Sequence, residues 1–176
     1  MDYSSLGIKE EIRQAIDKMG FTELTEVQEK AIPLMLAGKD VVAKAPTGTG
    51  KTCAFGVPLI QGIDPALAKP QALVLCPTRE LCLQITEELG SLTAFLPDIR
   101  IAAVYGGQPI EKQITQLKKR PQIVVATPGR LMDHMKRRTV RLDKVETVVL
   151  DEADRMLDMG FVRDVTRILD QIKHRK

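Results

Sequence analysis

The chain has 176 residues, of which 44% are hydrophobic, so it is long and apolar enough for one domain with a real core. Its formal net charge of +3 is weak evidence for a nucleic-acid partner on its own. Three cysteines without a CxxC pair and only two histidines argue against a structural zinc site, and the odd cysteine count suits a reducing compartment. Neither a basic-then-apolar leader nor a membrane-length apolar run is found, so we expect a cytoplasmic protein with no membrane partner.

Two helical patterns come first in the chain. In residues 8–20, four apolar residues share one helical face, and Gly20 is a typical C-terminal cap; the four are Ile8, Ile12, Ile16 and Met19. In residues 25–32, Thr25 followed three residues later by Gln28 has the form of a capping box. We expect residues 1–38 to form a helical region packed on a core of residues 39–176.

From residue 41 onward, short β-branched apolar runs alternate with helical patterns. The predicted strands are residues 41–45, 72–76, 100–104, 122–126 and 145–150. Their nearly continuous apolar character is typical of strands covered on both faces. Between them, residues 79–92 carry an apolar set near 3.6 spacing, namely Leu81, Cys82, Ile85, Leu89 and Leu92, and residues 161–172 form another amphipathic helix. This alternation predicts an α/β fold with a mostly parallel, doubly wound sheet and helices on both faces.

The stretch VVAKAPTGTGKTCAF, residues 41–55, joins a predicted strand to a predicted helix through a glycine-rich segment. Backbone N–H groups can approach a phosphate chain closely only where Cβ is absent, as at Gly48 and Gly50. Lys51 then supplies a cation for the terminal phosphates, and the Thr52 hydroxyl completes the coordination of Mg²⁺. The segment matches the P-loop form G-x-x-x-x-G-K-[ST] except at its first glycine, and an ordinary glycine-rich turn is the structural alternative. The predicted phosphate-binding residues are Ala45, Pro46, Thr47, Gly48, Thr49, Gly50, Lys51 and Thr52.

Three carboxylates in four residues follow the last predicted strand, in the sequence DEAD from Asp151 to Asp154. Parallel sheets bind ligands at the carboxyl ends of their strands. Asp151 is therefore well placed to hold Mg²⁺ through water, and Glu152 to orient or deprotonate an attacking water. A solvated acidic turn is the alternative, which the P-loop 100 residues upstream weakens.

The combination of APTGTGKT and DEAD resembles the DEAD-box ATP-dependent RNA helicase family, whose N-terminal domain has a RecA-like fold. Residues 20–28, GFTELTEVQ, resemble the family's Q motif, which implies that Gln28 reads the adenine edge of ATP and that Phe21 also contributes. Tyr3 stands where the family usually has phenylalanine, and Leu24 where proline is usual. The capping interpretation of Gln28 stays open.

Three further motifs resemble segments that contact the sugar–phosphate backbone of single-stranded RNA in this family. They are PTRELCLQ, the glycine pair, and TPGR, and the implied RNA-binding residues are Pro77, Thr78, Arg79, Gly106, Gly107, Thr127, Pro128, Gly129 and Arg130. Arg79 and Arg130 suit bidentate phosphate contacts, and the glycines allow close backbone approach. Backbone contacts carry little sequence information, so we expect little base specificity.

The resemblance also implies parts that this sequence does not contain. The family's Ser-Ala-Thr motif, with which Asp154 normally couples hydrolysis to strand separation, is absent, as is the second RecA-like domain with its arginines. An arginine finger is worth roughly 10³–10⁵ in rate. We therefore expect this chain to be an N-terminal portion that binds nucleotide but by itself hydrolyses ATP poorly and does not unwind RNA.

Two other interpretations remain open at this point. The chain could act as a non-catalytic, nucleotide-dependent module that binds RNA or protein. It could also be a different P-loop enzyme, such as a small-molecule kinase, although no segment suits the lid that such an enzyme needs.

Overall fold

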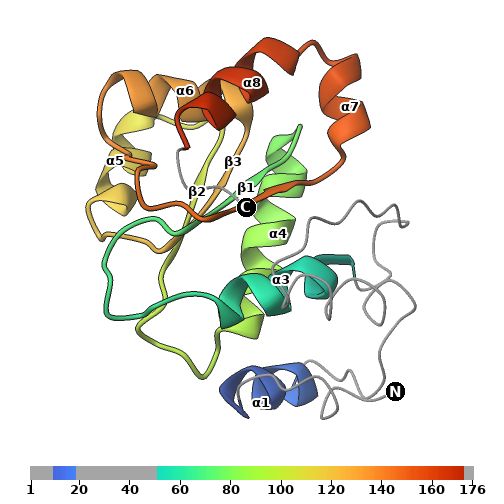
Figure 1. The fold of residues 1–176 in the computed structure, drawn as a ribbon, viewed down its shortest axis with the longest axis vertical. Helices are drawn as coiled ribbons and strands as arrows, with labels where there is room; N and C mark the ends of the chain where they lie inside the picture. The colour runs from blue at the N-terminus through green and yellow to red at the C-terminus, as the bar shows by residue number, and fades with distance from the viewer. Residues whose placement is uncertain (1–9, 19–50, 173–176) are drawn as a thin grey trace. The chain divides into compact units, whose positions relative to one another are not determined.

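The computed structural model describes residues 10–18 and 51–172, coloured in Figure 1. Its elements are α1 (Glu10–Lys18), α3 (Lys51–Gln61), β1 (Ala72–Leu75), α4 (Arg79–Leu92), β2 (Ile101–Val104), α5 (Ile110–Leu117), β3 (Ile123–Ala126), α6 (Pro128–Lys136), β4 (Thr147–Leu150), α7 (Ala153–Asp158) and α8 (Val162–Asp170). The predicted helix at 25–32 and strand at 41–45 lie outside the described residues. In the described ranges, no helix is both long and apolar enough to cross a membrane.

The chain forms two compact units, and the sheet belongs to the second, which comprises Pro65–Thr86 and the residues from Ile99 onward. Four parallel strands pair in the order β2-β3-β1-β4. The pairs are in register along their whole length, so that the last residues of all four strands lie in one row: Val104, Ala126, Leu75 and Leu150. The four predicted strands in this part of the chain are therefore confirmed.

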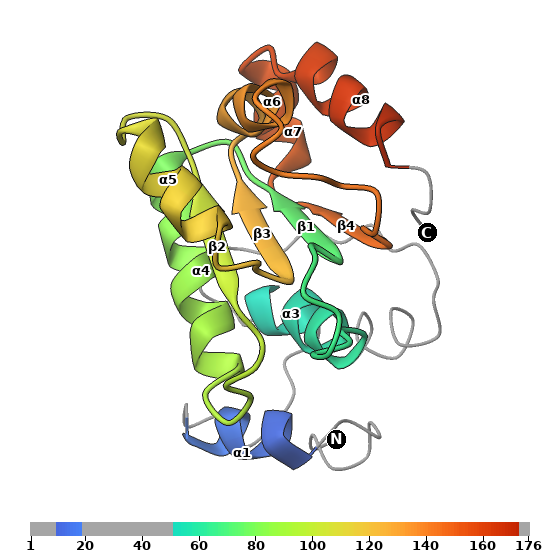
Figure 2. The ribbon, with the colours of Figure 1, turned by 90° about the vertical axis from the view of Figure 1, so that its left-hand side faces the viewer.

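The strand order determines which face of the sheet each helix covers. The connection from β1 to β2 crosses β3 in one direction, and the connections from β2 to β3 and from β3 to β4 run back the other way. Because such crossovers are right-handed, α5 and α6 lie on one face and α4 on the opposite face (Figure 2). On the α5–α6 face, alternate strand residues such as Leu73, Leu75 and Val124 pack with Leu131 of α6 and Ile168 of α8 in one buried core.

The sequence predicts strands covered on both faces, and this expectation is wrong for β4. All residues of β1 and β3 are buried, whereas Thr147–Val149 are half-buried and Leu150 is 39% exposed. The apolar composition of β4 is the same as that of a buried strand, so composition could not reveal the difference.

The first unit contains α1, α3 and residues 87–98, and its packing depends on one close approach of helices. Ile12 of α1 is fully buried, as its predicted inward position requires. Leu89 and Leu92, from the predicted inner face of α4, are also fully buried. A Cβ placed on Gly56 of α3 would come within 2.9 Å of a methyl carbon of each of these two leucines. Glycine at this position therefore lets α3 lie directly against α4.

Two helical glycines of this unit provide a matched test of that packing. Gly56→Ala should lower the free energy of unfolding by about 1 kcal/mol, because the two leucines are fully enclosed and have no space to move into. Gly90→Ala should raise it by about 0.5–1 kcal/mol, because a Cβ there meets nothing within 4 Å and alanine favours the helix. Urea denaturation of both variants measures the difference. Equal stabilities of the two variants would contradict the close approach at Gly56.

Candidate functional site

The candidate site begins where the four strands of the sheet end. The backbone ladder continues one step past the strands: Thr127 N donates to Val104 O at 3.0 Å, Cys76 N to Ala126 O at 3.0 Å, and Asp151 N to Leu75 O at 2.9 Å. The segments that follow β2, β3, β1 and β4 therefore start side by side along one edge, over a width of about 14 Å at the usual strand spacing. They are the glycine pair, TPGR, PTRELCLQ and DEAD.

Arg79 and the glycine pair meet at this edge. The Arg79 guanidinium lies over the ring of Tyr105, 5.3 Å from its centroid, and the residue is exposed. Gly107 has φ of +90°, a conformation that favours glycine, and a Cβ on it would lie 3.5 Å from Arg79 NH1. Tyr105, which is buried, therefore fixes an exposed cation beside exposed backbone at Gly106 and Gly107. The sequence motifs did not include Tyr105.

The start of α4 explains how Arg79 is presented. The Thr78 hydroxyl accepts a hydrogen bond from Leu81 N at 3.2 Å and so caps the helix, while Pro77 is buried. Cys82, one turn into α4, is fully buried, and its thiol approaches Val125 O at 3.4 Å. Arg79 therefore occupies the first turn of a helix that is anchored to the sheet.

The TPGR segment begins α6 beside β2. Thr127 is 9% exposed and Pro128 is the first helical residue, whereas Gly129 is exposed. Arg130 NH1 donates to Gln108 O at 2.8 Å and to Gln113 Oε1 at 3.2 Å. Both hydrogens of that nitrogen are therefore used within the protein. One arm of the guanidinium thus holds the loop after β2, and the role of Arg130 in binding a phosphate stays a prediction.

Behind Arg130 lies a buried polar network that motif matching did not reveal. Gln113 and His134 are both fully buried. The Gln113 amide nitrogen donates to Tyr105 O at 2.8 Å and to Gln108 Oε1 at 3.0 Å, and His134 Nε2 lies 2.9 Å from Gln113 Oε1. Because that oxygen can only accept, Nε2 carries the proton. His134 Nδ1 lies 2.7 Å from the Thr139 hydroxyl, which also lies 3.1 Å from the backbone oxygen of His134.

Burial lowers the pKa of His134 below its ordinary value of 6.5, and the nearby charge of Arg130 lowers it further. The carboxylate of Asp133 acts in the opposite direction, and Arg137 again lowers the pKa. The imidazole is therefore neutral near pH 7.

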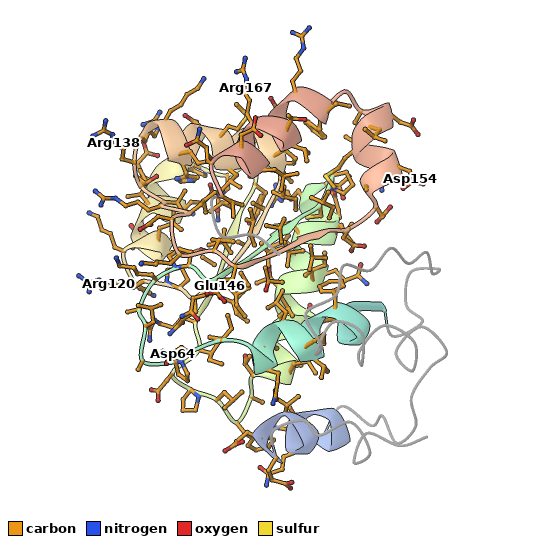
Figure 3. All side chains as sticks on the ribbon, viewed as in Figure 1. Asp64, Arg120, Arg138, Glu146, Asp154 and Arg167 are labelled. Atoms are coloured by element: carbon orange, nitrogen blue, oxygen red, sulfur yellow. The ribbon has the colours of Figure 1, made fainter. Side chains whose placement is uncertain are left out.

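The DEAD segment turns sharply from β4 into α7. Asp151 is 4% exposed at the strand end. Glu152 has φ 53° and ψ 51°, a left-handed conformation that is uncommon for a residue other than glycine and that recurs at functional sites. Its carboxylate pairs with Arg155 NH1 at 3.5 Å. Asp154 is exposed on α7 (Figure 3), and its Oδ1 accepts from Arg155 N at 3.0 Å.

Cys76, the residue after β1, is buried beside these carboxylates. Interaction with Cys82 and burial both raise the pKa of the Cys76 thiol, and the charges of Asp151 and Glu152 raise it further. Cys76 is thus a neutral packing residue, and Cys82 is also fully buried.

The predicted nucleotide-binding residues are described only in part. Lys51 and Thr52 lie in the helix α3, and residue 51 is also the first described residue after the undescribed range 19–50. That the P-loop opens this helix stays a prediction. Tyr3, Phe21, Gln28 and residues 45–50 lie outside the described residues, as do the side chains of Lys51 and Thr52. Among the described residues, no group of three or more His, Cys, Asp or Glu side chains could hold a metal ion.

The sequence and the fold were compared with known proteins. Residues 25–176 match the family model described as DEAD/DEAH box helicase. The ATP-dependent RNA helicase CshA of Listeria monocytogenes is 54% identical over 97% of this chain and 32% of its own length. The DEAD-box ATP-dependent RNA helicase CshA of Geobacillus kaustophilus is 50% identical over 97% of this chain and 36% of its own length. The chain thus spans about a third of the length of these curated relatives.

Solved structures give the same result. A DEAD box protein from the hyperthermophile Methanococcus jannaschii superposes with a TM-score of 0.92 and 42% identity, over 98% of this chain and 47% of that one. A hypothetical ATP-dependent RNA helicase from Sulfolobus tokodaii superposes with a TM-score of 0.86 and 44% identity, over 96% of this chain and 49% of that one. The predicted RecA-like α/β fold is therefore confirmed.

The protonation of His134 can be tested directly because the chain has only one other histidine, His174. In a His174→Gln background, an NMR titration of the single imidazole should give a pKa below 6.5. As the pH falls below 6.5, the imidazole of the unfolded chain would then take up a proton that the imidazole of the folded chain does not. The free energy of unfolding should be at its full value above pH 6.5 and fall as the pH drops below that value.

The control for this titration is His134→Asn in the same background, which has no imidazole. Denaturation at pH 7.5 and pH 5.5 should show a smaller pH-dependent loss for this variant than for its parent. A pKa at or above 6.5 would contradict the buried, neutral assignment.

Proposed function

Because this chain belongs to the DEAD/DEAH box helicase family, we propose that it is the N-terminal ATP- and RNA-binding part of an ATP-dependent RNA helicase. In the whole protein, ATP hydrolysis would be coupled to RNA duplex unwinding. The observation that carries this proposal is the row of strand ends, since it starts three predicted RNA loops and the DEAD carboxylates along one sheet edge. The three RNA loops and the DEAD carboxylates would then act from one edge of a single sheet.

The RNA-binding half of the proposal rests on the loops after β1, β2 and β3. Exposed glycine backbone at Gly106, Gly107 and Gly129 lets a sugar–phosphate chain approach N–H groups. Arg79 adds a positively charged guanidinium, held on Tyr105, for one phosphate. None of these groups reads a base edge, so we infer binding to single-stranded RNA with little sequence preference.

The nucleotide-binding half rests on the helix that contains Lys51 and on the sequence before it. The unpaired N–H groups and positive end of a helix favour phosphates, and Lys51 would contact the terminal ones. Gln28 would read the adenine edge, with Tyr3 and Phe21 against the base. Residues 1–38 would form this adenine-reading region and residues 39–176 the RecA-like core.

The carboxylates of the DEAD segment fit a magnesium-bound nucleotide. Mg²⁺ usually binds one or two carboxylates together with phosphate oxygens and water, so a cage of protein ligands is not required. Thr52 and, through water, Asp151 would hold the ion, which when bound neutralises charge on the phosphates. Glu152 would orient the attacking water and accept its proton, and its pairing with Arg155 limits where the carboxylate can point.

Two functions would depend on parts outside this chain. The second RecA-like domain of a whole helicase would complete the RNA cleft and supply arginines to the transferring phosphate. Asp154, which is exposed on α7, would couple to that domain.

The buried thiols of Cys76 and Cys82 support a reducing compartment such as the cytoplasm.

Nucleotide selectivity tests the adenine-reading role of Gln28. The chain should bind ATP more tightly than GTP by calorimetry, and Gln28→Ala should lose this preference. Lys51→Ala should lower the affinity for both nucleotides by about tenfold or more, because a charge-assisted contact is worth roughly 1.5–3 kcal/mol. If Gln28→Ala binds ATP as its parent does, Gln28 is a helix-capping residue instead.

The role of Arg79 is tested with a labelled single-stranded RNA oligonucleotide. Arg79→Ala should weaken binding about tenfold, since it removes both a phosphate contact and the cation on Tyr105. The RNA affinity of Arg79→Lys should lie between those of the parent and of Arg79→Ala, because lysine keeps the charge but not the planar fork. The matched control is Arg167→Ala, which removes the same charge from the exposed outer side of α8 (Figure 3) and should change affinity less than twofold. Equal effects of Arg79→Ala and Arg167→Ala would rule out a specific site at Arg79.

A further inference from the structure

Gln113 is a buried amide whose hydrogen-bonding capacity is fully used. Its nitrogen donates two hydrogen bonds, to Tyr105 O and Gln108 Oε1, and its oxygen accepts two, from Arg130 NH1 and His134 Nε2. A side-chain amide has two donors and two acceptor sites, so nothing remains unsatisfied. The partners come from the segment after β2 and from α6, which are otherwise separate in the chain.

The orientation of this amide is fixed by its partners. Tyr105 O can only accept and Arg130 can only donate, so a flipped Gln113 would set like groups against each other. On the far side, the Thr139 hydroxyl lies beside His134 Nδ1, and the Nε2 proton of His134 is directed at Gln113. From Tyr105 O through Gln113 to His134 Nε2, the network therefore has one arrangement of donors and acceptors.

Burial makes this arrangement strict. Gln113 and His134 are fully buried, and a buried polar group left without its partner is destabilising because no water replaces the lost hydrogen bond. Displacing the Tyr105–Gln108 segment relative to α6 would break several of these hydrogen bonds at once. The segment that carries Gly106 and Gly107 is thus held at a fixed distance from Arg130 and from the exposed Gly129.

We propose that Gln113 is a positioning residue for RNA binding, which sets the spacing between the glycine-pair loop and the start of α6 so that both meet one RNA backbone. This inference rests on the proposed RNA-binding function of these loops. Gln113 itself is buried and does not contact RNA. Its effect is transmitted through Tyr105, whose ring supports Arg79, and through Arg130.

The experiment compares Gln113→Met with Gln116→Met in this chain. Methionine keeps a similar length and adds no charge, but it can neither donate to Tyr105 O nor accept strongly from Arg130. Gln116 lies on the same helix, three residues further on, and is only half-buried. NMR titrations with a single-stranded oligouridine and with ADP give both affinities at a temperature where melting curves show each variant folded.

We expect Gln113→Met to weaken oligouridine binding about tenfold, which corresponds to about 1.4 kcal/mol, with ADP affinity unchanged within twofold. Gln116→Met should match the parent for both ligands. A general loss of structure would instead lower both affinities together. The amide signals of Gly106 and Gly107 should shift in Gln113→Met and not in Gln116→Met.

A second variant keeps the inference testable if Gln113→Met does not fold. Thr139→Val removes the hydroxyl beside His134 Nδ1. Thr139 lies beyond the C-terminal end of α6, whereas TPGR lies at the N-terminal end of that helix, which is about 13 Å long at 1.5 Å per residue. Thr139→Val should weaken oligouridine binding about threefold through the network, whereas Thr115→Val, an exposed change on α5, should not.

The outcomes separate the two proposals. A parent chain that binds oligouridine, and loses that binding on Arg79→Ala, supports the proposed function. If Gln113→Met, or Thr139→Val in its place, then binds as the parent does, the positioning role is overturned and the proposed function stands. If the parent shows no oligouridine-dependent shifts, the proposed function fails and the positioning role fails with it.

Discussion

The constraint on which the rest of this structure depends is the in-register parallel pairing of four strands that end in one row. Because adjacent strands pair residue for residue up to Leu75, Val104, Ala126 and Leu150, the next residue of each segment emerges at the same height. A slip of one residue in any pair would exchange the side chains that face the two helical layers as well as move the loop that follows the strand. The hydrophobic core and the candidate site are therefore fixed by the same hydrogen bonds.

Much of this arrangement was predictable from local chemistry. Inner strands are continuous apolar runs, so β1 and β3 were found with boundaries within one residue, and the helical set from Leu81 to Leu92 is buried as predicted. The positions of the loop motifs directly after strands were predictable, because glycine, proline and threonine at fixed offsets indicate the local backbone geometry. The partial exposure of β4 was not predictable, because its apolar composition is that of a buried strand.

The polar network behind the loops was missed for a different physical reason. Gln113 lies between Ile110 and Leu117 on α5, at helical spacing, so its position on the buried face was a visible signal. Its partners were not visible, since they lie 8, 17 and 21 residues away and meet it only after the sheet has formed. Sequence can show that a polar residue faces a core, but tertiary structure decides what satisfies it.

The two arginines of the RNA motifs illustrate the same limit, because equal residue types have unequal environments. Arg79 is exposed and lies over the face of Tyr105, a contact that does not occupy hydrogen-bond donors of the guanidinium. Arg130 is half-buried and commits one nitrogen to Gln108 O and Gln113 Oε1. A bound phosphate would therefore gain more from Arg79, whereas Arg130 contributes mainly by keeping the neighbouring backbone N–H groups in place. These different environments of Arg79 and Arg130 favour recognition of the RNA sugar–phosphate backbone, since rigid N–H groups and one cation fit any sequence of bases equally well.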